Sequence, residues 1–155
     1  MRCPSRNYRL SFEHDLFGCS PHDRGPDVTP PDFPGSPFEK AAGYSRAVVD
    51  GDFAFVAGTT GYDYATMTMP EDVTSQSRNC FKTIEAVLEE GGFAMADIVR
   101  ATYYITDIRD ADAHFAVCGE VLGEIRPAAT ILVVAALLKP EMKIEIEVTA
   151  KRRSV

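Results

Sequence analysis

Few side chains in this sequence are spaced in patterns known to do chemistry. The 155 residues include four cysteines and three histidines, with no CxxC pair and no HExxH motif, so a zinc site lacks its usual ligand spacing. The sequence also contains no GxGxxG, no Walker lysine loop and no GxSxG elbow, which are the signatures of dinucleotide, nucleoside triphosphate and serine-hydrolase sites. We therefore expect neither a metal nor a cofactor.

Two cysteines and one histidine fall within predicted helices. Cys80 and Cys118 lie on apolar helical stripes, which favours reduced thiols packed in the core over nucleophiles. His114 precedes Cys118 by four residues, so the two could face one metal ion, but two ligands do not make a site. We interpret His114 as a partly exposed residue beside the apolar stripe.

Glu145 has more chemical promise. It alternates with Ile144 and Ile146, and the period of two places it on the opposite face of a strand. If another subunit covers that face, burial raises the pKa of the carboxyl and lets it orient or deprotonate a water molecule. A solvent-facing glutamate at the rim of the sheet satisfies the same period, and both interpretations stay open here.

The elements that must position these groups follow from periodicity. An Asp50-Gly51 pair suits a hairpin turn, and Ile108, Ala111, Phe115, Cys118 and Leu122 form one predicted helical stripe. In chain order we expect strands at 44–49 and 53–57, a helix at 72–90, a strand at 99–107, a helix at 108–122, and strands at 131–138 and 144–150. This ββαβαββ order predicts an α+β fold with one mixed sheet and both helices on one face.

The strand predicted at 131–138 is apolar on both sides. A sheet covered by helices on one face leaves its other face bare, and exposed apolar residues there would form a patch typical of an interface. We therefore expect the chain to associate with copies of itself.

The first 37 residues differ in composition from the rest. They hold seven of the ten prolines, and each proline lacks an N–H and favours extended geometry before it. We expect an extended N-terminal arm at 1–37 and one folded domain at 38–155. The net charge of −7 disfavours nucleic acid and anionic membranes as partners. Without a long apolar segment, a cytoplasmic location is expected.

Four segments between residues 36 and 153 read, in order, PFEKAAGYSRAV, FAFVAGTTG, IVRATYYITDIRD and RPAATILVVAALLKPEMKIEIEVTAKR. They resemble the Rid proteins, the reactive intermediate deaminases of the RidA/YjgF family, long labelled endoribonuclease L-PSP. The resemblance implies a chorismate-mutase-like ββαβαββ fold. It also implies a homotrimer whose sheets form a central barrel, with three small-molecule clefts between subunits.

Three positions match the residues that this family uses in its cleft. The resemblance makes Tyr44 the cleft tyrosine, which donates a hydrogen bond, and Gly58 the glycine after the second strand. It makes Glu145 the glutamate that positions water.

Other cleft positions depart from the pattern. Ala57 stands where deaminating members have serine, Phe115 where they have asparagine, and Ile131 where they commonly have cysteine. Ala129 replaces an arginine that holds the carboxylate of an amino-acid-derived imine, which alanine cannot do. Arg126 could supply a displaced cation, or it ties the turn before the fourth strand.

Three functions remain. The first is a Rid-type hydrolase that deaminates an imine-like metabolite, with ordinary 2-aminoacrylate deamination not expected because of Ala129. The second is a binding module that senses or sequesters a small ligand in the same cleft. The third, a ribonuclease or translation inhibitor, rests on the old family label, and the acidic chain has no basic stripe to support it.

Overall fold

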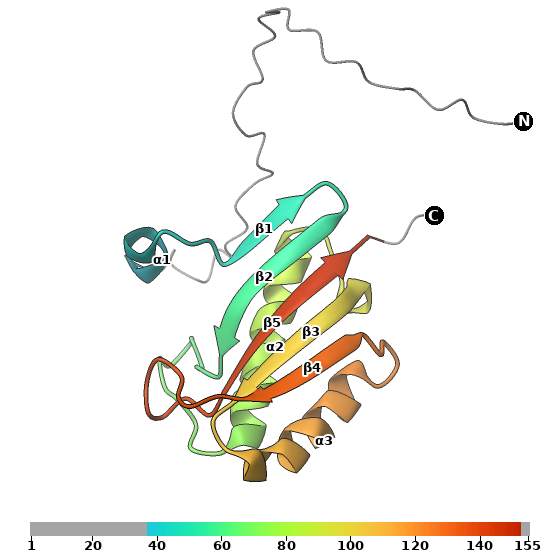
Figure 1. Ribbon diagram of the computed structural model, residues 1–155. Helices are drawn as coiled ribbons and strands as arrows, with labels where there is room; N and C mark the ends of the chain where they lie inside the picture. Colours follow the sequence, from blue (N-terminus) through green and yellow to red (C-terminus); the bar gives the residue numbers. More distant parts are fainter. Residues whose placement is uncertain (1–36, 153–155) are drawn as a thin grey trace, which may run out of the picture.

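The computed structural model describes residues 37–152 (Figure 1), so the predicted N-terminal arm lies outside them except for its last residue. The elements follow in the order α1 (Pro37–Ala42), β1 (Ala47–Asp50), β2 (Phe53–Thr60), α2 (Val73–Glu90), the short 3-10 helix η1 (Met95–Asp97), β3 (Ile98–Ile105), the 3-10 helix η2 (Ile108–Asp110), α3 (Ala111–Leu122), β4 (Ala128–Val133) and β5 (Ile144–Lys151). Apart from α1 and the two 3-10 helices, this is the predicted ββαβαββ order.

The five strands form one mixed sheet in the order β1-β2-β5-β3-β4. The β3–β4 pair is parallel, and the other three pairs are antiparallel. Both α2 and α3 lie on the same side of this sheet (Figure 1), as predicted. We call the side without helices the open face. None of the helices within residues 37–152 is long and apolar enough to cross a membrane.

The core lies between the sheet and the two helices. In β5, Ile144 and Ile146 are fully buried against the helices, and Glu145 between them points to the open face. The helix α2 supplies Ile84, Val87 and Leu88, each at most 1% exposed. Strand alternation therefore separates a packed face from a face that carries polar side chains.

Local sequence accounts for both ends of α2. Asp72 caps its N-terminus, because its carboxylate accepts a hydrogen bond of 2.7 Å from the backbone N–H of Ser75. At the other end Gly92 adopts a left-handed φ of 74°, a conformation that glycine reaches without a steric penalty.

The fourth strand differs from its predicted range. It covers Ala128–Val133 instead of 131–138, because it pairs in parallel with β3, whose last residue Ile105 is opposite Val133. Where β3 ends there is no partner to continue the ladder. The apolar run at 134–138 therefore lies in a loop, in which Leu138 is 81% exposed.

The predicted stripe of the second helix is also wrong in part. Residues 108–110 form η2, and α3 begins only at Ala111. Ile108 and Phe115 are 67% and 47% exposed, whereas His114 and Val117 are fully buried. The helix is thus rotated from the predicted stripe, and the partly exposed position expected for His114 is incorrect. A 3-10 turn at the start of the segment shifts the phase of every residue after it.

Candidate functional site

The carboxylate of Glu145 lies directly over the backbone of Gly58. A Cβ at residue 58 would overlap Oε1 of Glu145 and come within 2.8 Å of its Cδ. Gly58 lies where the β2–β5 register shifts between Val56 and Thr59, and such a bulge redirects the strand. Only glycine allows β2 to approach the carboxylate this closely, so the two predicted residues form one local unit.

The bulged end of β2 is fastened to α2. The thiol of Cys80 donates a hydrogen bond of 3.2 Å to the carbonyl of Thr59, and the side-chain amide of Asn79 donates one of 3.0 Å to the carbonyl of Gly61. Burial raises the pKa of the Cys80 thiol. Cys80 is therefore a packed, protonated anchor for the site, as the core-packing interpretation predicts.

Three influences act on the Glu145 carboxyl. Burial raises its pKa and so does the neighbouring charge of Glu147, while the charge of Arg46 lowers it. A carboxyl whose pKa is raised in this way is suited to exchange protons with water.

Arg46 is a site residue that the sequence analysis missed. It is 5% exposed, its guanidinium lies 3.4 Å from the carboxylate of Glu39 in α1, and its carbonyl accepts a hydrogen bond of 2.9 Å from the N–H of Ala57. A buried arginine is unusual. Its place immediately before an apolar strand and two residues after Tyr44 was the available sequence signal.

Two phenols follow the elements that carry this polar group. Tyr44, which follows α1, is 42% exposed. Tyr64, in the loop after β2, is half-buried, and burial raises the pKa of its phenol while the charge of Arg46 lowers it. We define the Glu145 group as Arg46, Gly58, Thr60 and Glu145.

The remaining predicted site residues lie elsewhere in the subunit. In β4, Ala129 is opposite Ala101 of β3, and Ala101 is fully buried on the helix side. Glu145 is opposite Tyr104, whose side chain points to the open face. Ala129 and Glu145 are therefore on opposite faces of the sheet, and a single subunit does not bring them together.

We call Phe115, Ala129 and Ile131 the β4-edge group. Ile131 is opposite Tyr103 and packs on the core, and the ring of Tyr103 is 4.6 Å from that of His114. The ring of Phe115 lies 6.0 Å from that of His114. Phe115 is thus an exposed aromatic residue on α3, while Ala129 and Ile131 belong to the edge strand β4.

Arg126 contacts the turn between α3 and β4. Its Nε donates a hydrogen bond of 3.0 Å to the carbonyl of Gly123, and its φ is 52°. It closes the turn between α3 and β4.

The buried His114 joins two helices. Its Nδ1 is 3.1 Å from the hydroxyl of Ser77 in α2, and its Nε2 is 3.2 Å from the sulfur of Cys118. Burial lowers the pKa of His114 to about 4 and raises that of Cys118 to about 11. The pair is thus neutral and packed, and within residues 37–152 no cluster of three or more potential metal ligands occurs.

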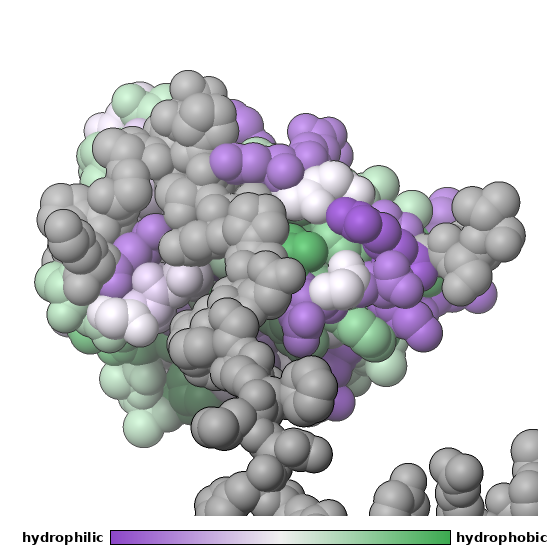
Figure 2. Space-filling model, turned by 90° about the horizontal axis from the view of Figure 1, so that it is seen from above, coloured by the Kyte–Doolittle hydropathy of each residue, from purple (hydrophilic) through white to green (hydrophobic). Residues whose placement is uncertain are grey.

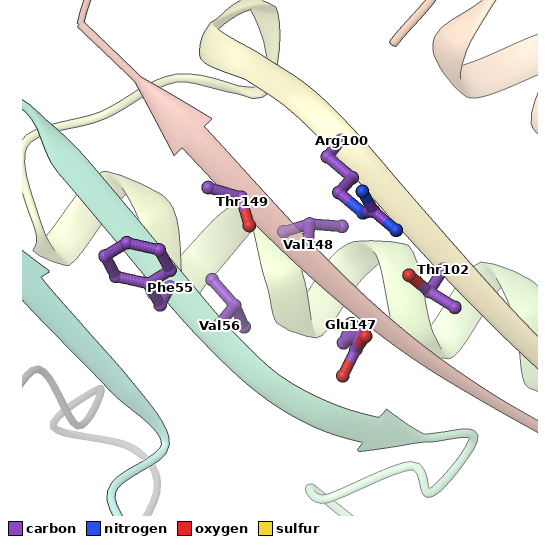
Figure 3. A pocket seen from close by; sticks show the side chains of 7 residues that line it. All are labelled: Phe55, Val56, Arg100, Thr102, Glu147, Val148 and Thr149. Atoms are coloured by element: carbon purple, nitrogen blue, oxygen red, sulfur yellow. The ribbon is translucent and has the colours of Figure 1, made fainter. Parts of the chain in front are cut away.

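The open face also carries a shallow pocket of about 220 Å³ (Figure 3). Phe55 of β2, Arg100 and Thr102 of β3, and Glu147 and Thr149 of β5 line it. Their side chains point away from α2, which lies behind the sheet. The carboxylate of Glu147 accepts a hydrogen bond of 3.0 Å from the phenol of Tyr104. Figure 2 shows one end of the molecule, where hydrophilic and hydrophobic residues lie side by side.

Comparison with known proteins decides the family. The model of the family described as endoribonuclease L-PSP matches residues 35–152. This chain belongs to that family. Endoribonuclease L-PSP is the older label of the RidA/YjgF family that the sequence motifs resemble. The resemblance is therefore confirmed.

Individual members of the L-PSP family are similar to this chain in sequence and in fold. The 2-iminobutanoate/2-iminopropanoate deaminase of Salmonella typhimurium is 31% identical over 113 residues, which cover 71% of this chain and 88% of the relative. The crystal structure of a YjgF/YER057c/UK114 family member from Mycobacterium tuberculosis is 39% identical with a TM-score of 0.71, over 77% of this chain and 95% of that one. Escherichia coli TdcF, solved with bound serine, is 28% identical with a TM-score of 0.67, over 71% of this chain and 88% of that one. The chorismate-mutase-like fold is thereby confirmed.

Proposed function

We propose that this chain is a cytoplasmic, homotrimeric hydrolase that deaminates small imines. In the overall reaction, water adds to the C=N bond, the C–N bond then breaks, and the products are a carbonyl compound and ammonia. The observation that carries the proposal is the carboxylate of Glu145, half-buried over Gly58, with its pKa raised by burial. The Salmonella relative named as an imine deaminase supports this choice of reaction.

The open face supports self-association. It carries exposed apolar side chains on three strands, namely Val48, Phe53, Phe55 and Leu132, each between 37% and 48% exposed. A patch of this kind is typical of an interface. In a trimer the β4-edge group of one subunit would be adjacent to the Glu145 group of the next, which would unite the residues that one subunit keeps on opposite faces.

Each group then has a distinct role in the cleft. Glu145 takes a proton from water as the oxygen attacks the imine carbon, and it returns that proton to the nitrogen. Tyr44, at the exposed rim, donates a hydrogen bond to the ligand. The β4-edge group offers apolar contacts where a carboxylate anchor would need a cation, because residue 129 is alanine. The preferred substrates are therefore imines whose binding does not depend on a carboxylate.

The experiment measures imine hydrolysis by the purified chain. Carboxylated imines are generated in place by an amino-acid oxidase and carboxylate-free imines by an amine oxidase, and semicarbazide traps whatever the protein does not hydrolyse. The parent should reduce the trapped fraction, and Glu145→Gln should lower kcat by roughly a hundredfold or more. Absence of acceleration by the parent for every imine would contradict the proposal.

A second function, binding without chemistry, is favoured by Ala129 and Phe115, which leave the β4-edge group without a charged anchor. Under that alternative the parent binds a small amino or oxo acid in calorimetry and accelerates no imine. RNA serves as a further substrate in the same assay, and cleavage that Glu145→Gln leaves unchanged would point to a ribonuclease site elsewhere.

A further inference from the structure

Two loops meet at the end of the sheet where β2 ends and β5 begins (Figure 1). The loop at 61–72 connects β2 to α2, and the loop at 134–143 connects β4 to β5. Thr60, the last residue of β2, is opposite Glu145 in the antiparallel ladder. The two loops therefore determine how the strands that carry Gly58 and Glu145 approach each other.

Gln76, in the first turn of α2, contacts both loops and is fully buried. Its Nε2 donates hydrogen bonds of 2.7 Å to the carbonyl of Pro70 and 2.9 Å to the carbonyl of Glu141. Its Oε1 accepts a hydrogen bond of 2.8 Å from the backbone N–H of Lys143. The carbonyls need a donor and the N–H needs an acceptor, so a side-chain amide matches all three partners in one orientation.

The end of β2 packs on the same residue. A Cβ at Gly61 would lie 2.4 Å from the Cβ of Gln76 and 2.6 Å from its Cα, so the chain passes directly against α2 here. The side-chain amide of Asn79 also donates a hydrogen bond of 3.0 Å to the carbonyl of Gly61. Gln76 thus contacts the residue after Thr60 on one strand and, through Lys143, the start of the strand that carries Glu145.

A second link between the loops lies at the surface. The hydroxyl of Tyr62 accepts a hydrogen bond of 2.8 Å from the ammonium of Lys139 and lies 3.4 Å from the carboxylate of Glu141. Water can replace these exposed contacts, so they contribute little to holding the loops together. The backbone groups that Gln76 binds are costly to leave without a partner where they are buried. The connection through Gln76 is therefore the stronger of the two.

We propose that Gln76 is a positioning residue that holds the Glu145 carboxylate over Gly58. The inference rests on the proposed function. Because Gln76 is fully buried in α2, it acts through the backbone, by fixing where β2 ends and where β5 begins. A carboxylate that handles the proton of an attacking water must be placed accurately, since a displacement of about 1 Å can lower a rate by about a hundredfold.

The test compares Gln76→Glu with Ser77→Ala. A carboxylate at residue 76 keeps the acceptor for the N–H of Lys143 but has no donor for the two carbonyls. With an imine that the parent hydrolyses, Gln76→Glu at pH 8 should lower kcat by roughly tenfold to a hundredfold and change KM less, because Glu145 is displaced. Relative to the parent at the same pH, the loss should be smaller at pH 6, where a protonated carboxyl again donates to one carbonyl.

Ser77→Ala is the matched control. Ser77 is the next residue of α2 and is equally buried, but its hydroxyl is 3.1 Å from Nδ1 of His114, in the helix layer. Its loss should lower the stability of the fold and leave kcat at the parental value. Denaturant titration of each variant measures the loss of stability, so that kcat is compared only where the protein is folded.

A second measurement does not depend on catalysis. In Gln76→Glu the backbone amides of residues 142–146 should exchange their hydrogens at least about tenfold faster than in the parent, because the start of β5 opens locally. In Ser77→Ala they should exchange faster only by as much as the whole domain does. Both measurements are repeated at pH 6, so a Gln76→Glu protein that unfolds at pH 8 still gives a result.

The outcomes separate the inference from the proposed function. If the parent hydrolyses imines and Gln76→Glu matches it in kcat at both pH values, Gln76 is not a positioning residue while the proposed function stands. An equal loss of kcat in Ser77→Ala would also overturn the inference. If the parent hydrolyses no imine, the proposed function fails, and hydrogen exchange alone decides. Faster exchange at 142–146 in Gln76→Glu only would show that Gln76 fixes the start of β5, and equal exchange in both variants would overturn it.

Discussion

The carboxylate of Glu145 occupies the space that any side chain at residue 58 would need. We therefore expect Gly58→Ala to displace the Glu145 side chain from its position over β2. The carboxylate is the flexible end of a long side chain, so unfolding free energy should change by only about 1 kcal/mol, whereas imine hydrolysis should fall nearly as far as in Glu145→Gln. Denaturant titration and kcat are the two measurements. A Gly58→Ala protein as active as the parent would show that the close approach has no role in activity.

Stability should depend on pH through Glu145. Its pKa is raised in the fold, so the folded state holds this proton more tightly than the unfolded chain, and the contribution of Glu145 to stability falls as pH rises through the raised pKa. Glu145→Gln should therefore be at least as stable as the parent at pH 7. The difference should vanish below about pH 4, where the unfolded carboxyl is also protonated. Melting temperatures of both proteins from pH 3.5 to 7.5 provide the check, and a Gln variant clearly less stable at pH 7 would contradict it.

The opposite pH dependence is expected from His114. Its pKa is lowered to about 4 by burial, and the unfolded value is about 6.5. The contribution of His114 to the free energy of unfolding is complete above pH 6.5. It is lost as the pH falls towards 4, a change of roughly 3 kcal/mol in all. His114→Gln should flatten the dependence of unfolding free energy on pH between 6.5 and 4.5, whatever its stability at pH 7. An unchanged slope would mean that another group dominates this range.

A cation at residue 129 should change substrate preference. Ala129→Arg is expected to raise kcat/KM for carboxylated imines by roughly tenfold to a hundredfold, the effect of one charge-assisted hydrogen bond. Phe115 is exposed and stands where deaminating members have asparagine, so Phe115→Asn combined with Ala129→Arg should increase the gain. The amide analogue of the same imine is the control, and its turnover should not rise. A well-folded Ala129→Arg protein that is no faster than the parent would favour the binding module over the hydrolase.

The open face predicts the assembly. Light scattering should give a mass about three times the 17.0 kDa of one chain. Phe55→Lys, which puts a charge on an open-face residue that is 48% exposed, should weaken the trimer. Ile108→Lys provides a comparison at an exposed apolar residue of η2, outside the sheet. A parent protein of about 17 kDa at micromolar concentration would rule out the trimer.

Much of this architecture is determined by sequence periodicity. Alternation around Glu145 is sufficient to place Ile144 and Ile146 in the core, because successive strand residues point to opposite faces. The helix over 73–90 could be predicted from its spacing and its cap at Asp72. The family motifs also pointed to Gly58, over whose backbone the Glu145 carboxylate lies.

Tertiary structure decided what depends on pairing between distant segments. The end of β4 at Val133 is set by the end of β3 at Ile105, a limit that the apolar run at 131–138 does not contain. The burial of His114 follows from the rotation of α3 after η2. Arg46 acts on the Glu145 carboxyl because β1 pairs with β2 and β2 pairs with β5, which brings together residues about 100 positions apart. Its place beside Tyr44 in the sequence hints at a role, but its effect on Glu145 arises only when those strands align.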